Sequence, residues 1–163
     1  EKILPAGLSL IEQPTDKRDL KLLGRITREA AIPVMADESL MSLRDAFRLA
    51  RRDLVDMINI KLMKSGGIYE ALKISAVAKE YKKSCMIGSM LEGPISLLAA
   101  AHFGVAAENV TMADLDSPLY LKEHPLLEPF HLLRDEIRLG LEPGLGIDTI
   151  MNRLDLFQAP LYS

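Results

Sequence analysis

Charged side chains occur in this sequence at the points where short apolar runs stop. Glu12 follows LSLI, Asp37 follows IPVMA, Lys61 lies near the end of MINIKL, and Asp114 and Asp116 follow VTMA. Carboxylates that gather without His or Cys beside them are typical ligands of a hard divalent cation such as Mg²⁺. A lysine beside such a cation has a lowered pKa, because burial and like charge both disfavour its protonated form, and it can act as a general base.

The apolar runs alternate with amphipathic stretches of helix length. We expect strands at 8–11, 32–36, 57–62, 85–87 and 110–113, and helices at about 16–29, 43–52, 68–81 and 95–103. The third helix is expected to face inward with Leu72, Ala76 and Ala78, and Gly104 is expected to end the fourth. This alternation predicts βα units and a parallel sheet, and the nearly continuous apolar strands indicate that both sheet faces are covered.

In a parallel β/α barrel the carboxyl ends of all strands open on one face, which carries the chemistry. The charged residues of four separate strands would then converge there. Each residue also has a simpler interpretation, because a single Asp or Glu after a strand often caps the next helix and Lys61 could reach solvent. We interpret Lys64 and the charged runs 17–19 and 51–53 as solvated faces or helix ends.

The composition excludes several classes of protein. The 163 residues are 48% hydrophobic and 26% charged with a net charge of −3, and no run approaches the ~18 apolar residues of a membrane helix. An acidic balance and 5% aromatics without Trp argue against a nucleic-acid surface. The single Cys85 lies in the apolar run SCMIGSML and indicates a buried thiol in a reducing cytoplasm. No glycine-rich phosphate fingerprint follows the first strand, which argues against a nucleotide-binding Rossmann unit.

The two ends of the chain differ from this alternation. Residues 132–139 alternate as LLRDEIRL and precede the turn-rich GLEPGLG, which predicts a hairpin-like excursion followed by a short terminal segment. The N-terminus reads EKILPAGLSL, without an initiator Met or the pattern of a signal peptide. We expect the chain to begin within a larger domain.

Four segments resemble the muconate-lactonizing branch of the enolase superfamily: IEQP at 11–14, ADES at 36–39, NIKLMKSGG at 59–67 and the GLEPGLGID tail. The spacing agrees, with 25 positions from Glu12 to Asp37 and 24 from Asp37 to Lys61. The resemblance implies that Glu12 and Asp37 are ligands of Mg²⁺, with Mn²⁺ as the alternative. It also implies that Lys61 is one of two acid/base lysines and that Glu38 lies beside the ligands.

The Asp-Leu-Asp at 114–116 is similar to the motif of the dipeptide epimerases, typified by the L-Ala-D/L-Glu epimerases. There the two carboxylates hold the α-ammonium group of the dipeptide, and paired carboxylates are a suitable partner for a buried cation. The segment CMIGSMLE at 85–92 is also similar and would place Met90 beside the N-terminal residue of the substrate. The resemblance therefore implies an isomerase that transfers a proton at the α-carbon of the C-terminal residue of a dipeptide.

The resemblance covers strands four to eight of a (β/α)7β barrel, at residues 1–127, and a return segment at 128–163. The Lys-x-Lys motif of strand two and the Asp of strand three have no counterpart, so we expect this portion to need its N-terminal half or a further copy for activity. Other readings within the superfamily are an N-acylamino-acid racemase and a muconate cycloisomerase. Asp114 and Asp116 argue against both, because those substrates carry no free α-ammonium. A non-catalytic truncated barrel with open sheet edges is the remaining alternative.

Overall fold

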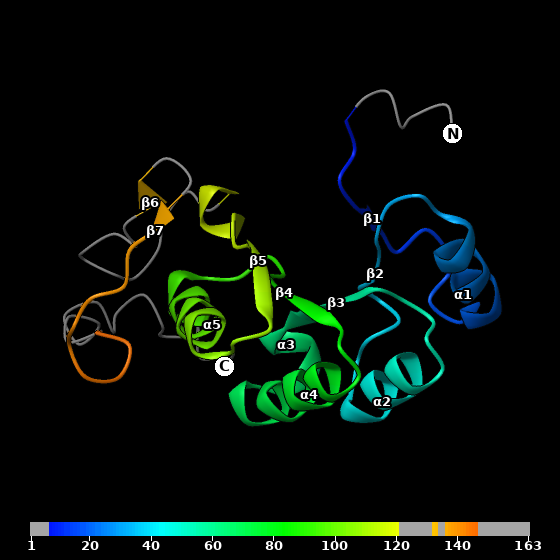
Figure 1. Ribbon diagram of the computed structural model, residues 1–163. Coiled ribbons are helices and arrows are strands. Elements are labelled where there is room, and N and C mark those ends of the chain that lie inside the picture. The colour runs from blue at the N-terminus through cyan, green and yellow to red at the C-terminus, as the bar shows by residue number, and fades with distance from the viewer. Residues whose placement is uncertain (1–6, 121–131, 134–135, 147–163) are drawn as a thin grey trace, which may run out of the picture.

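A parallel five-stranded sheet forms the centre of the computed structural model, which describes residues 7–120, 132–133 and 136–146 (Figure 1). The strands follow each other in space in the order of the sequence: β1 (Ile11–Glu12), β2 (Val34–Ala36), β3 (Met57–Lys61), β4 (Ser84–Gly88) and β5 (Val110–Asp114). The main helices between them are α1 (Leu20–Glu29), α2 (Leu43–Arg51), α4 (Ile68–Glu80) and α5 (Pro94–Ala106). Shorter elements are α3 (Leu62–Ser65), the 3₁₀ turn η2 (Ser117–Tyr120) and the strands β6 (Leu132–Leu133) and β7 (Glu136–Ile137).

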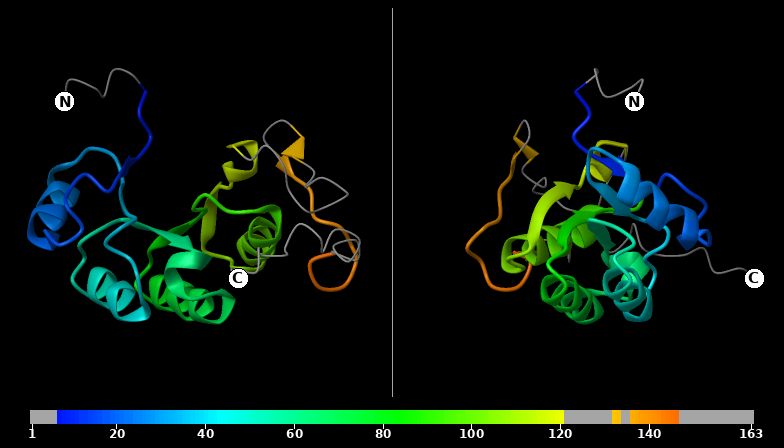
Figure 2. Two further views of the ribbon diagram at one scale, coloured as in Figure 1. Left: turned by 180° about the vertical axis from the view of Figure 1, so that it is seen from behind. Right: turned by 45° about the vertical axis from the view of Figure 1, so that its right-hand side comes forward.

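The four main helices lie along one side of the curved sheet, and no helix of the described residues covers the other side (Figures 1 and 2). The strands thus form an arc with an outer, helix-covered face and an inner face. This arrangement confirms the expected α/β fold of part of a β/α barrel. Among the described residues, no helix is long and apolar enough to cross a membrane.

Local sequence signals explain where the helices begin. The Asp19 carboxylate accepts a hydrogen bond from Leu22 N at 2.9 Å and caps α1, which therefore starts later than expected. The Ser42 hydroxyl accepts one from Asp45 N at 3.3 Å and caps α2 as expected. Pro94 occupies the first turn of α5, where a missing N–H costs nothing.

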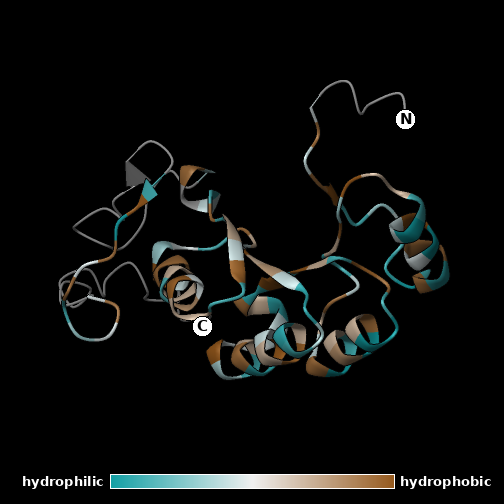
Figure 3. Cartoon of the chain, in the orientation of Figure 1, coloured by the Kyte–Doolittle hydropathy of each residue, from teal (hydrophilic) through white to brown (hydrophobic). Residues whose placement is uncertain are grey.

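The two faces of the sheet differ in chemistry. Val34, Ala36, Ile58, Ile60 and Ile87 belong to the main core, together with inward residues of the helices. The inner face instead carries a small cluster of Met35, Met57 and Met86. Figure 3 shows hydrophobic strands and helices that present a hydrophilic side outward, while α5 is hydrophobic around most of its surface.

Two expectations about the helices are wrong. The inward face of α4 consists of Ala71, Ile74, Ser75 and Ala78, whereas Leu72 is 47% exposed and Ala76 is exposed as well. Leu72 and Ala76 were assigned inward by their apolar type, whereas Ala78 is buried as predicted. Gly104 does not end α5. It lies inside the helix, where a Cβ would come within 3.0 Å of Ile87, so glycine allows the helix to approach β4.

The ends of the chain are described only in part. The strand expected at 8–11 lies at Ile11–Glu12, so Glu12 belongs to the strand itself. The predicted hairpin is confirmed by the antiparallel pairs Leu132–Ile137 and Leu133–Glu136. The expected boundary between a barrel portion at 1–127 and a return segment at 128–163 falls outside the described residues and stays a prediction.

Candidate active site at the strand ends

The register of the sheet places the predicted strand-end groups on its inner face. Side chains of paired positions in neighbouring strands share a face, and side chains two positions apart along a strand do so as well. Glu12 pairs with Met35, and Met35 pairs with Met57, so Asp37 and Lys61 fall on the same face as Glu12. Ile60 and Leu62, which flank Lys61, belong to the outer core as expected.

The Asp37 carboxylate is shared between two lysines. Lys61 Nζ lies 2.8 Å from Asp37 Oδ2, and Lys64 Nζ donates to Asp37 Oδ1. The Asp37 side chain is only 10% exposed, so both contacts act in a region of reduced solvent screening. The predicted approach of Asp37 and Lys61 is therefore present in the structure.

Lys64 lies in the last turn of α3, in agreement with the helix-end alternative, but its side chain is buried, so the alternative of a solvated residue is wrong. Its side chain is 7% exposed, and its ammonium also donates to the carbonyl oxygens of Asp37 at 2.7 Å and Asn59 at 3.2 Å. All three N–H groups thus have partners at the ends of β2 and β3. The four-residue helix α3 places Lys64 there and ends at Gly66, whose φ of 90° requires the left-handed region.

Glu12 is held by an amide from β3. Asn59 Nδ2 donates to Glu12 Oε1 at 2.8 Å, and Asn59 is 1% exposed. A Cβ on Gly88 would lie 2.4 Å from Asn59 Oδ1, so the glycine leaves the space that this amide fills. Asn59 Oδ1 is a buried polar atom without a hydrogen-bond partner among the described residues.

Gln13 organises the loop after β2 and was missed from the sequence. Its Oε1 accepts hydrogen bonds from Asp37 N at 2.9 Å and Ser39 N at 3.0 Å, and its Nε2 donates to Ser39 Oγ at 2.9 Å. The backbone at Gln13 has a φ of 37°, which is uncommon for a residue with a side chain. A polar residue between Glu12 and Pro14 at a strand end was the available signal.

Charge and burial compete at these groups. Burial alone would raise the pKa of Asp37, but its hydrogen bonds and charge interactions with Lys61 and Lys64 outweigh this and hold it below its usual value. Burial alone would lower the pKa of Lys61, yet the hydrogen bond and charge of Asp37, with the charges of Glu12 and Glu38, hold it above the usual range. The expectation of a depressed Lys61 pKa concerns a lysine beside a bound cation and stays a prediction. Burial dominates at Lys64 and lowers its pKa.

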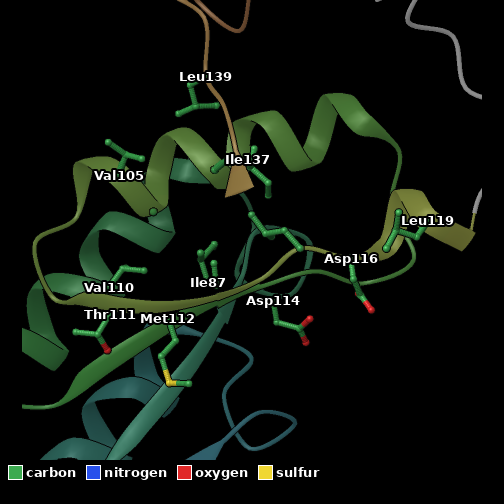
Figure 4. Close-up of a pocket in the computed structure, with 14 residues that line it drawn as sticks. Ile87, Val105, Val110, Thr111, Met112, Asp114, Asp116, Leu119, Ile137 and Leu139 are labelled. Carbon is green, nitrogen blue, oxygen red and sulfur yellow. The ribbon is translucent and has the colours of Figure 1, made fainter. Parts of the chain in front are cut away.

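Asp114 and Asp116 are exposed and extend from the chain on the same side, away from Val105 and Leu139 (Figure 4). They lie at one end of a hollow of about 510 Å³ between β5, α5 and the segment after β7. Asp116 precedes η2 and accepts a hydrogen bond from the Tyr120 hydroxyl at 3.1 Å. Met90, in the loop after β4, is 45% exposed.

The acids of the inner face fit a hard cation as part of a ligand set. Glu12 and Asp37 offer carboxylate oxygens, and the Lys61 ammonium already interacts with both and with the exposed Glu38. Within the described residues, no three His, Cys, Asp or Glu side chains are grouped so that they could hold a metal. A complete site on this face needs at least one further ligand.

An arc of βα units with polar groups at the carboxyl ends of its strands defines a portion of a β/α-barrel protein. The chain belongs to the enolase C-terminal domain-like family, whose model matches residues 1–152. It is 44% identical over 145 residues to the L-Ala-D/L-Glu epimerase of Clostridium acetobutylicum, covering 89% of this chain and 40% of that protein.

Two solved structures are similar in fold. The dipeptide epimerase of Enterococcus faecalis V583, complexed with Mg and L-Leu-L-Tyr, matches with a TM-score of 0.75 at 43% identity over 76% of this chain and 35% of that one. The muconate lactonizing enzyme of Pseudomonas putida matches with a TM-score of 0.88 at 32% identity over 95% of this chain and 43% of that one. The chain thus spans about two fifths of the length of these relatives.

Proposed function

We propose that this chain is the C-terminal part of a Mg²⁺-dependent dipeptide epimerase and that it is inactive without the remainder of the barrel. The observation that carries the proposal is one row of the sheet: Lys61 pairs with Gly88, and Gly88 pairs with Asp114. A candidate base and a candidate ammonium-binding carboxylate therefore share the inner face, two strand spacings or about 10 Å apart along the sheet. This span suits a substrate with an acidic α-proton at one end and an ammonium at the other.

In this proposal Glu12 and Asp37 hold the metal together with a ligand from outside this chain. The bound cation would stabilise the negative charge that develops on the substrate carboxylate. Lys61 removes or returns the α-proton on one face of the α-carbon, and the base for the opposite face belongs to the missing half. Asp114 and Asp116 bind the α-ammonium, with Met90 beside the N-terminal residue and Glu38 beside the metal ligands.

The similarity to muconate lactonizing enzyme supports a second candidate, a cycloisomerase built on the same barrel. Two features of this chain favour the epimerase. The exposed pair Asp114 and Asp116 would repel a dicarboxylate substrate, whereas it attracts an ammonium. The greater identity to a dipeptide epimerase, 44% against 32%, points the same way.

The test is α-proton exchange in the protein as it is encoded in its genome. Incubation of L-Ala-L-Glu with Mg²⁺ in D₂O should replace the α-proton of Glu with deuterium and produce the epimer, as followed by NMR. EDTA should stop the exchange, and Lys61→Met should abolish proton transfer on one face. Conversion of cis,cis-muconate without dipeptide exchange would replace the proposal by the cycloisomerase. The 163-residue chain, assayed alone, should be inactive.

A further inference from the structure

Glu92 is a buried carboxylate in the loop between β4 and α5. It is 5% exposed, and none of the ion pairs in the described part of the chain includes it. Its carboxylate accepts hydrogen bonds from Met90 N at 2.7 Å and from the Ser96 hydroxyl in the first turn of α5. The positive end of the helix dipole also stabilises a carboxylate at this place. The side chain thus fixes the loop that carries Met90.

The backbone of Glu92 is joined to the turn after β5. The Ser117 hydroxyl accepts from Glu92 N at 3.3 Å and donates to Glu92 O at 3.1 Å. Ser117 is 3% exposed, so both bonds are shielded from water. One hydroxyl therefore bonds both the backbone donor and the backbone acceptor of Glu92.

A second hydrogen bond joins the loop after β4 to the end of β5, three residues before Glu92 and three before Ser117. Ser89 Oγ donates to Asp114 O at 3.3 Å, directly after the paired positions Gly88 and Asp114. Segments 89–92 and 114–117 are thus tied at both ends, and the tie continues the parallel pairing of β4 and β5 beyond the sheet. Met90 lies between the two ties on one segment and Asp116 on the other.

We infer that Glu92 and Ser117 are positioning residues that fix Met90 and Asp116 relative to each other and so shape the site for the N-terminal residue of the substrate. The inference rests on the proposed function, because it assigns these two exposed side chains to a dipeptide. Met90 and Asp116 are exposed for contact with a ligand, while each has a buried anchor within two residues. A substitution at Glu92 or Ser117 should therefore change the distance between Met90 and Asp116 without removing either side chain.

The test compares Ser117→Ala with Ser75→Ala in the protein as encoded. Ser75 is also a buried serine, 6% exposed, and its hydroxyl bonds to Asn109 away from both segments. Ser117→Ala should speed amide hydrogen exchange about tenfold in segments 89–92 and 114–117 together. It should raise KM for a free dipeptide about tenfold, the equivalent of about one net hydrogen bond, and change kcat less than twofold. Ser75→Ala should alter neither amide exchange in these two segments nor KM.

Glu92→Gln provides a milder second variant, because the amide oxygen still accepts from Met90 N. The KM of this variant should stay close to that of the wild type. A large loss of kcat would instead indicate that Glu92 acts as an acid or base, and this would overturn the positioning role. If Ser117→Ala leaves both amide hydrogen exchange and KM unchanged, the inference is overturned. It is also overturned if the protein is an active epimerase in which Ser117→Ala speeds amide exchange but leaves KM unchanged. A wild-type protein without epimerase activity would refute the proposed function and the substrate assignment. Coupled exchange in both segments would then still support the tie itself.

Discussion

The ammonium of Lys61 lies 2.8 Å from one oxygen of Asp37, and the ammonium of Lys64 binds the other oxygen of the same carboxylate. The two lysines are not equivalent. Lys64 is 7% exposed and uses all three of its donors, whereas Lys61 is 14% exposed and makes one hydrogen bond. Lys64 is therefore the fixed partner of Asp37, and Lys61 is the partner that can leave.

Replacing the two lysines should affect stability unequally. Lys64→Met should destabilise the protein by about 3 kcal/mol, because it removes three buried hydrogen bonds, one to the Asp37 carboxylate and two to the carbonyl oxygens of Asp37 and Asn59. Lys61→Met should cost about 1 kcal/mol, since the remaining lysine still compensates Asp37. Urea unfolding of both variants measures the difference. Equal losses would contradict the assignment of Lys64 as the fixed partner.

Asp37 should contribute to the loss of stability in acid. Its pKa is lower in the folded protein than its ordinary value of 3.8, so folding favours the ionised form. The stabilisation is present above pH 3.8 and is lost as the pH falls through the lower folded value. The unfolding free energy of Asp37→Asn should therefore be lower at pH 7 and fall less between pH 5 and pH 3 than that of the wild type. Glu108→Gln, at an exposed ion pair, is the control and should change the profile little.

Gly88→Ala should disturb the inner face from within. The new methyl group would lie 2.4 Å from Asn59 Oδ1 and must displace the amide that holds Glu12. We expect a loss of about 1–3 kcal/mol in unfolding free energy, together with weaker Mn²⁺ binding by the intact protein. Gly140→Ala, where the nearest atom would be 3.9 Å away, is the matched control. If Gly88→Ala changes neither the unfolding free energy nor Mn²⁺ binding, the Asn59 side chain can adopt another conformation that still holds Glu12.

Cys85 should be inert while the protein is folded. The side chain is fully buried, and burial raises the pKa of its thiol to about 12. Because alkylation requires the thiolate, iodoacetamide at pH 8 should leave the folded protein unmodified and label it rapidly in urea. Mass spectrometry of the labelled protein measures this. Rapid labelling without denaturant would contradict the burial of this thiol.

Asp116→Asn should impair binding of substrates with a free N-terminus and leave N-acetylated substrates nearly unaffected. If Asp116 binds the α-ammonium, the variant should raise KM for a free dipeptide by at least tenfold, because an amide cannot replace a carboxylate as partner of a cation. An N-acetylated dipeptide lacks that charge, and its kinetics should change little. Steady-state assays with both substrates make the comparison. Equal effects on both would reassign Asp116 to a structural role through Tyr120.

The sequence by itself determined the order of elements and the row of strand-end groups. Apolar runs of five residues, such as IPVMA, are long enough for a strand and too short for a helix, and caps such as Ser42 mark helix starts locally. The placement of Asp37 and Lys61 on one face followed from alternation along parallel strands. Strand and helix formation depends on near neighbours in the chain, so the pattern of residue types was sufficient to predict these elements.

Tertiary structure decided what each polar group does. Lys64 was interpreted as a solvated residue or helix end and Gln13 was given no role, yet both contact Asp37 from elements more than twenty positions away. Which residues of α4 face inward, and why glycine stands at position 104 within α5, likewise depended on which helix surface packs against the core. The pKa of Lys61 rises or falls according to the balance of burial against the charges of Asp37, Glu12 and Glu38. Burial and charge act through space over a few ångströms, and distance along the chain carries no direct information about either.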